Sequence, residues 1–167
     1  CSKHYMAMAD IQIIPLGMDD APSAYTIMES VQPGTWSQAT FLDALTPPNL
    51  AWQLCIEKRC IGLCIVQTLI TPQFKEWTLE EMAIHPEYQG QGYGNAMLEY
   101  MLKQAQQLAV GEIFLEVRET NLPAQSLYTR HGFIQIDRRK GYYPSLPING
   151  LVTSAREDAL IMRWESS

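Results

Sequence analysis

Apolar residues mark several short stretches of the chain, either alternating with polar residues, as over residues 76–84, or in runs rich in apolar and branched residues, as over residues 50–57 and 60–69. Each of these stretches predicts a β-strand. The predicted strands cover residues 11–15, 50–57, 60–69, 76–84, 112–117, 133–138 and 158–164. Side chains alternate between the two faces of a strand. In the strand over residues 76–84, Glu81 is therefore expected on the same face as Trp77 and Leu79.

Between the strands, apolar residues recur at helical spacing and predict helices over residues 20–31, 36–45, 93–108 and 123–131. The order of strands and helices predicts one α/β domain over residues 8–167. Its central twisted sheet should be mixed and partly antiparallel, with helices on both faces. Met6 and Met8 are both possible starts, so residues 1–7 are expected to be an extension or a remnant of cloning.

Composition narrows the classes of function. A chain of 167 residues with 47% hydrophobic content suits one domain with a full core. The net charge of −6 disfavours nucleic acid as a direct ligand, because phosphate backbones are held by excess Lys and Arg. No apolar run reaches the length of about 18 residues that spans a membrane. We expect a cytoplasmic monomer without membrane association, and the spacing of the histidines predicts no metal site.

The four cysteines form no C-x-x-C pair, which indicates reduced thiols. A hairpin with Lys58 and Arg59 at its tip would place Cys55 opposite Gly62 rather than opposite Cys60. We therefore expect no disulfide in this hairpin.

The most informative motif is the glycine turn at residues 89–94, with the sequence Gln-Gly-Gln-Gly-Tyr-Gly, between a predicted strand and a predicted helix. Glycines allow successive amides to point into one concavity at the positive end of a helix, which predicts a diphosphate site. No Lys-Ser/Thr pair follows, so a nucleotide-triphosphate loop is disfavoured. The mid-chain position and the spacing also disfavour a dinucleotide fold. The alternative is a glycine-rich turn without a ligand.

This hexapeptide matches the Q/R-x-x-G-x-G/A signature of the GNAT superfamily of N-acetyltransferases, which the chain resembles from residue 11 onward. Residues 115–118, Leu-Glu-Val-Arg, and the later Leu127-Tyr128 pair resemble the second cofactor block of that family. Residues 139–144 and 156–162 resemble its bacterial ribosomal-protein-alanine N-acetyltransferase branch, the RimI type.

The resemblance implies a GNAT fold and acetyl-CoA as the acetyl donor, without a metal. The cofactor-binding residues that it implies are Met82, Ala83, Ile84, Gln89, Gly90, Gln91, Gly92, Tyr93, Gly94, Asn95, Asn121 and Tyr128.

Acetyl transfer requires a base for the acceptor amine and an acid for the leaving thiolate. The resemblance places Glu116 as the base and Tyr128 as the acid. Glu116 is the only charged residue in the run 113–117, and an unpaired carboxylate among apolar neighbours has a raised pKa. The alternatives are a salt bridge for Glu116 and a core-packing role for Tyr128. Glu80 and Glu81 are rival bases.

The same branch implies that the acceptor is the N-terminal α-amine, with alanine first, of a protein such as a small-subunit ribosomal protein. The substrate-binding residues expected are Trp36, Glu81, Tyr142 and Tyr143. The segment 145–155 is longer than the loop expected in that branch, so the choice of acceptor stays open. The alternatives are a small amine, a lysine side chain, or a protein that binds acetyl-CoA without turnover.

Overall fold

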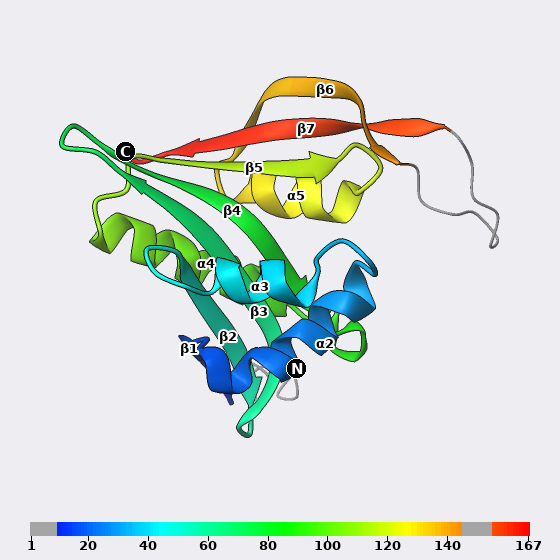
Figure 1. The fold of residues 1–167 in the computed structure, drawn as a ribbon. Coiled ribbons are helices and arrows are strands. Elements are labelled where there is room, and N and C mark those ends of the chain that lie inside the picture. The colour runs from blue at the N-terminus through cyan, green and yellow to red at the C-terminus, as the bar shows by residue number, and fades with distance from the viewer. Residues whose placement is uncertain (1–9, 145–154) are drawn as a thin grey trace, which may run out of the picture.

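The computed structural model describes residues 10–144 and 155–167 (Figure 1). Its elements in chain order are β1 (Ile11–Pro15), η1 (Met18–Asp20), α2 (Ala21–Val31), α3 (Gln38–Ala44), β2 (Leu50–Ile56), β3 (Arg59–Ile70), β4 (Lys75–Ile84), η2 (Pro86–Tyr88), α4 (Tyr93–Gln107), β5 (Glu112–Arg118), α5 (Leu122–Arg130), β6 (Ile134–Pro144) and β7 (Arg156–Glu165). The expected N-terminal extension and residues 145–154 lie outside the described residues.

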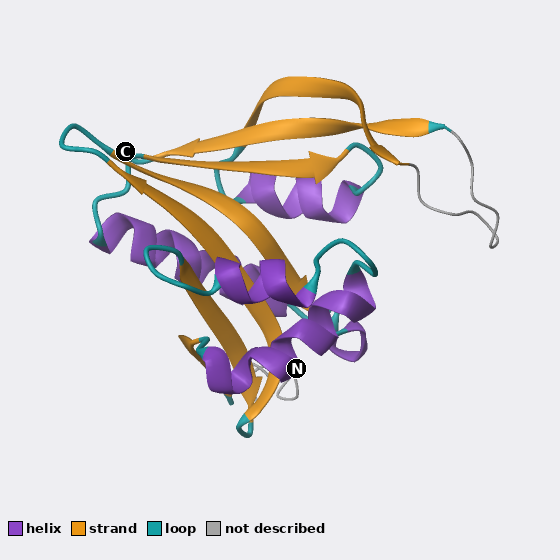
Figure 2. Ribbon diagram, in the orientation of Figure 1, coloured by secondary structure: helices purple, strands orange, loops and turns teal. Residues whose placement is uncertain are grey.

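The strands of the described residues form one seven-stranded sheet in the order β1-β2-β3-β4-β5-β7-β6. β4 and β5 pair in parallel, and the other neighbouring strands pair antiparallel. Helices α2 and α3 cover one face, and α4 and α5 cover the other (Figures 1 and 2). The predicted mixed α/β sheet with helices on both faces is confirmed.

β3 reads as a continuous apolar run because both of its faces are buried. Leu63 and Ile65 pack into the core under α2 and α3, whereas Cys64 and Val66 pack into the core under α4. No helix within residues 10–144 and 155–167 combines the length and the apolar character required to cross a membrane.

An irregularity in β4 overturns the predicted alternation of its side chains. Val66 pairs with Leu79 and Ile65 pairs with Glu81, so Glu80 is an extra residue on β4, a β-bulge. After an extra residue, the following side chains exchange faces. Trp77 and Leu79 therefore face α4, whereas Glu81 lies opposite Ile65 on the face of α2 and α3. The expectation that these three side chains share a face is wrong.

The hairpin between β2 and β3 turns one residue earlier than expected. Glu57 and Lys58 occupy its tip, both with positive φ. A two-residue turn of this kind commonly carries Asn or Gly, and neither marks it here. Cys55 consequently lies opposite Cys60 and not opposite Gly62, although both thiols are free. The predicted register is therefore wrong.

Candidate active site

A pocket of about 560 Å³ opens where β4 and β5 diverge. The ladder between these strands ends at the pair Leu79 and Leu115, and beyond this pair the two strands separate (Figure 1). Five parts of the chain line the pocket: the loop between α2 and α3, β4, β5, one side of α5 with its N-cap, and the end of β6. The lining residues are Val31, Gln32, Pro33, Gly34, Thr35, Trp36, Leu79, Glu80, Glu81, Met82, Leu115, Glu116, Val117, Arg118, Asn121, Ala124, Tyr128, Tyr143 and Pro144.

The glycine turn lies beside this pocket, at the start of α4, and does not line it. Gly90 and Gly92 have φ of 75° and 90°, a conformation that favours glycine, and Gly92 is the N-cap of α4. Gly94 lies inside α4 and has no such requirement. The turn therefore has the expected form, a glycine turn that leads directly into a helix N-terminus.

Two polar side chains near the turn make contacts within the protein. Gln89 Nε2 donates a hydrogen bond to the Ile84 carbonyl at 3.0 Å. Asn95 Oδ1 lies 2.6 Å from His131 Nε2, a contact that joins α4 to α5. Sequence reasoning missed this use of Asn95, because His131 is far away along the chain. The main-chain N–H groups at the start of α4 therefore remain the best candidates for holding a diphosphate.

Glu116 is exposed and paired, contrary to the expectation of an unpaired carboxylate among apolar neighbours. Its Oε1 lies 3.5 Å from Arg139 Nη1, and Tyr143 lines the same pocket from β6. Burial and the nearby Glu116 raise the pKa of Tyr143 to about 12. The apolar residues next to Glu116 in sequence point to the other face of β5, which explains the wrong expectation.

The rival carboxylates differ sharply in environment. Glu81 is only 6% exposed, and burial raises its pKa to about 8. Its Oε1 is buried and has no hydrogen-bond partner among the described residues. Glu80 is exposed on the bulge, and partial desolvation together with the charge of Glu116 raises its pKa. Adjacent in sequence, the two residues differ in burial and in neighbours because of the bulge.

Tyr128 lies on α5 and lines the pocket, with its ring 5.7 Å from that of Phe133. Burial raises the pKa of Tyr128, and Cys64 and Glu81 raise it further. Asn121 caps the same helix, because its Oδ1 accepts a hydrogen bond from the Ala124 amide at 3.2 Å. Asn121 therefore stabilises the start of α5, and it also lines the pocket.

The predicted acceptor-side aromatic residues lie at both rims of the pocket. Trp36 lines it from the loop between α2 and α3, and Tyr143 lines it from β6. Tyr142 is 43% exposed and packs against Tyr143, but it does not line the pocket.

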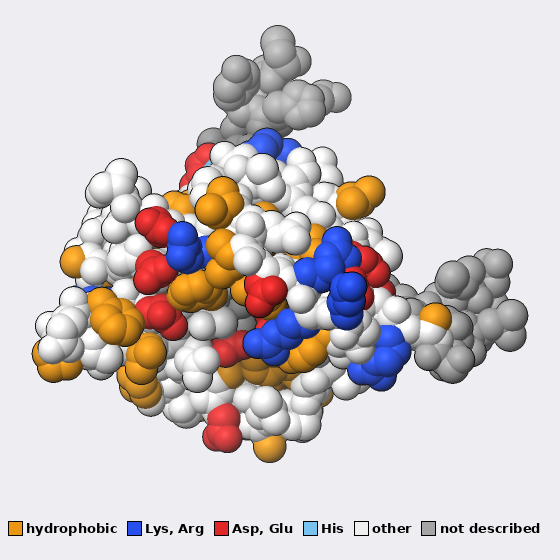
Figure 3. All heavy atoms as spheres, turned by 90° about the horizontal axis from the view of Figure 1, so that it is seen from above, with side chains coloured by type: hydrophobic (Ala, Val, Ile, Leu, Met, Phe, Trp, Pro, Cys, Tyr) orange, Lys and Arg blue, Asp and Glu red, His pale blue; other side chains and the backbone are white. Residues whose placement is uncertain are grey.

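Arg118 is a pocket residue to which sequence reasoning assigned no role. Its guanidinium lies 4.4 Å from the centre of the Tyr143 ring and 3.2 Å from the Glu157 carboxylate. Acidic and basic side chains lie side by side on the face that carries β6 and β7 (Figure 3). The signal available in the sequence was the i, i+2 spacing of Glu116 and Arg118, which places both on one face of a strand.

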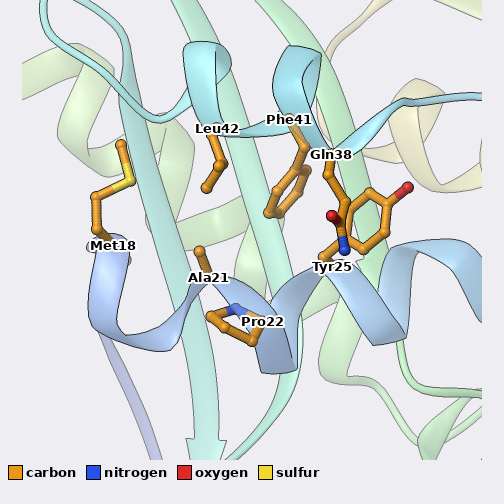
Figure 4. A pocket seen from close by; sticks show the side chains of 7 residues that line it. All are labelled: Met18, Ala21, Pro22, Tyr25, Gln38, Phe41 and Leu42. Carbon is orange, nitrogen blue, oxygen red and sulfur yellow. The ribbon is translucent and has the colours of Figure 1, made fainter.

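A second pocket, of about 370 Å³, lies between α2 and α3 (Figure 4). Its lining residues are Met18, Ala21, Pro22, Tyr25, Gln38, Phe41 and Leu42. None of them carries a carboxylate, amine or imidazole that could serve as a base. Of these two pockets, the one at the divergence of β4 and β5 therefore carries the candidate acid and base groups.

A sheet that opens between two parallel strands, with a glycine turn beside the opening and carboxyl and phenol groups in it, is the arrangement of an acyltransferase. The chain belongs to the Acetyltransferase (GNAT) family, whose model matches residues 18–133.

Comparison with known proteins identifies relatives that match most of the chain. This chain is 34% identical over 150 residues to the ribosomal protein bS18-alanine N-acetyltransferase of Escherichia coli strain K12. The matched region covers 90% of this chain and 94% of that protein. This chain is also 35% identical over 127 residues to the enzyme of the same name from Haemophilus ducreyi, and the matched region covers 76% of this chain and 81% of that protein. The crystal structure of the Escherichia coli ribosomal-protein-S18-alanine N-acetyltransferase has a TM-score of 0.82 and 33% identity, with 93% of each chain covered.

Proposed function

We propose that this protein transfers an acetyl group from acetyl-CoA to the N-terminal α-amine of a protein whose first residue is alanine. The observation that carries the proposal is the pocket between β4 and β5, which brings Glu116 and Tyr128 together beside the glycine turn. The names of the relatives that match most of the chain support alanine as the first residue and a ribosomal protein as the acceptor.

Acetyl-CoA would supply the acetyl group as a thioester, and the local structure fits such a ligand. Beyond Leu79 the edge of β4 is no longer paired with β5, so the main chain of Met82, Ala83 and Ile84 can hold an extended arm. The start of α4 suits the diphosphate, with Gly90 open to the surroundings. Asn121 and Tyr128 line the pocket between these parts and the acceptor.

Glu116 is the proposed general base, acting directly or through a water. Its carboxylate lies at the pocket wall, paired with Arg139. An α-amine has a pKa near 8, against about 10.4 for lysine, so an N-terminus releases its proton more readily to a carboxylate. The chemistry of the pocket therefore favours an N-terminal acceptor over a lysine side chain.

Tyr128 is the proposed acid. Its raised pKa keeps the phenol protonated at neutral pH, and the protonated phenol is the form that can donate a hydrogen bond or a proton to the departing sulfur. Because the same shift makes complete proton transfer less favourable, hydrogen bonding to the sulfur is the main contribution that we assign to this hydroxyl.

The test compares the acetylation of two peptides. One begins with alanine and has a free N-terminus; the other has the same sequence with a blocked N-terminus and carries one lysine. We expect acetyl-CoA to add one acetyl group to the α-amine and none to the blocked peptide, as located by fragmentation mass spectrometry. Glu116→Gln should slow turnover by about a hundred- to ten-thousand-fold. Glu112→Gln, on the same strand but outside the pocket, is the matched control and should keep its activity.

Two alternatives would show distinct results in the same assay. Acetylation of small amines with no turnover of the peptide would indicate that the acceptor is a small amine and not a protein. Tight binding of acetyl-CoA, measured by calorimetry, without turnover of any amine would indicate a binding protein instead of an enzyme.

A further inference from the structure

Glu81 lies on the acceptor side of the pocket and has no role in the proposed reaction. The bulge at Glu80 places Glu81 opposite Ile65, on the sheet face that α2 and α3 cover. The loop that joins those helices, residues 31–36, lines the same pocket. The glycine turn and α4 belong to the opposite face of the sheet.

One oxygen of the Glu81 carboxyl, Oε1, lacks a hydrogen-bond partner within the described part of the chain. The residue is 94% buried, being 6% exposed, and its Oε1 has no hydrogen bond there. A buried polar atom left unpaired lowers stability, so its presence at a pocket wall calls for an explanation. The guanidinium groups that line or border the pocket are engaged elsewhere: Arg118 contacts Glu157 and Arg139 contacts Glu116. A ligand could provide the missing partner.

We propose that Glu81 determines specificity by forming a hydrogen bond with the side-chain hydroxyl of the acceptor's first residue, so that N-terminal serine is preferred over a residue of equal size without a hydroxyl. This proposal rests on the proposed function, because it assumes that a protein N-terminus occupies the pocket. It extends the acceptor class from alanine to small residues that carry a hydroxyl.

The protonation state of the Glu81 carboxyl favours a hydroxyl group over a cation as its partner. Burial raises the pKa of Glu81 to about 8, so at pH 7 the group is mostly neutral. A neutral carboxyl both donates and accepts a hydrogen bond, which matches a hydroxyl, whereas it offers little to an ammonium group. The exposed carboxylates Glu80 and Glu116 are better suited to attract the charged amine.

The test compares three peptides that differ only in the first residue: serine, alanine and 2-aminobutyrate. 2-Aminobutyrate has a methyl group where serine has its hydroxyl, so this pair isolates the hydrogen bond. For the wild-type protein we expect kcat/KM to be about five- to tenfold higher for serine than for 2-aminobutyrate. Glu81→Met should reduce this ratio to about one. Glu81→Gln should preserve the preference, since an amide also donates and accepts.

Glu80→Gln is the neighbouring control and should preserve the ratio, because Glu80 is exposed on the bulge. A wild-type ratio of one or less would overturn the proposal, even if Glu81→Met failed to fold. An unchanged ratio in a folded Glu81→Met protein would also overturn it, as would an equal loss for all three peptides. Turnover of the alanine peptide alongside any of these results would leave the proposed function standing, whereas absence of all peptide turnover would refute both.

Discussion

Replacing Glu81 with glutamine should change how the stability of the protein depends on pH. The pKa of Glu81 is raised from 4.5 to about 8 by burial. Between these values the folded protein keeps the proton while the unfolded chain releases it, so the wild-type protein loses stability as the pH rises. This loss is complete above about pH 8, and it is absent below about pH 4.5.

The size of the effect follows from the width of that interval. At about 1.4 kcal/mol per pH unit, the three units from pH 5 to pH 8 correspond to about 4 kcal/mol. Glutamine has nearly the same shape and does not titrate. The free energy of unfolding of Glu81→Gln, relative to wild type, should therefore rise by about 4 kcal/mol between pH 5 and pH 8. The titrations common to both proteins cancel in this difference.

Urea unfolding followed by tryptophan fluorescence measures this difference, because Trp52, Trp77 and Trp164 are buried. Curves at pH 5, 6, 7, 8 and 9 for wild type, Glu81→Gln and the half-exposed control Glu112→Gln are sufficient. A difference between wild type and Glu81→Gln that stays constant within about 0.5 kcal/mol over this range would refute the reasoning, because it would mean that Glu81 is ionised in the folded protein at all these pH values.

Further changes test other parts of the site. Tyr128→Phe should lower kcat on the order of a hundredfold with little change in the KM for acetyl-CoA, and an unchanged kcat would remove Tyr128 from the reaction. Gly92→Ala should destabilise the protein by roughly 1–3 kcal/mol, because alanine is strained at a φ of 90°, and should weaken acetyl-CoA binding in calorimetry. Unaltered acetyl-CoA binding would show that the glycine turn does not hold the diphosphate. Arg118→Met should cost about 3 kcal/mol in urea unfolding, because it leaves the buried Glu157 without its ion partner. A loss below 1 kcal/mol would show that Thr120 alone satisfies Glu157.

Local patterns in the sequence predicted most of the elements. Alternation, runs of apolar and branched residues, and helical spacing predicted the strands and the main helices of the described residues, and the glycines at residues 90 and 92 marked the turn that has positive φ. β6 extends to Pro144, beyond the predicted end at Arg138. Its continued pairing with β7 through an irregular stretch accounts for this extension, and such pairing depends on a strand distant in sequence.

The partners of the site residues could not be predicted in the same way. Glu116 on β5 contacts Arg139 on β6 across β7, the strand that lies between them in the sheet. That strand order is a tertiary property, and no local pattern near Glu116 encodes it. The prediction that Glu116 belongs to the site was nevertheless compatible with the structure, since the residue lines the pocket.

The bulge at Glu80 explains why the two neighbouring carboxylates differ. A strand without the extra residue would direct Glu81 toward the face of Trp77 and Leu79, under α4. The bulge instead directs Glu81 toward the loop at residues 31–36 and leaves Glu80 exposed near Glu116. The bulge also lies where the ladder between β4 and β5 ends. One extra residue, which no glycine marks in the sequence, therefore separates an exposed carboxylate suited to a charged amine from a buried carboxyl suited to a neutral group.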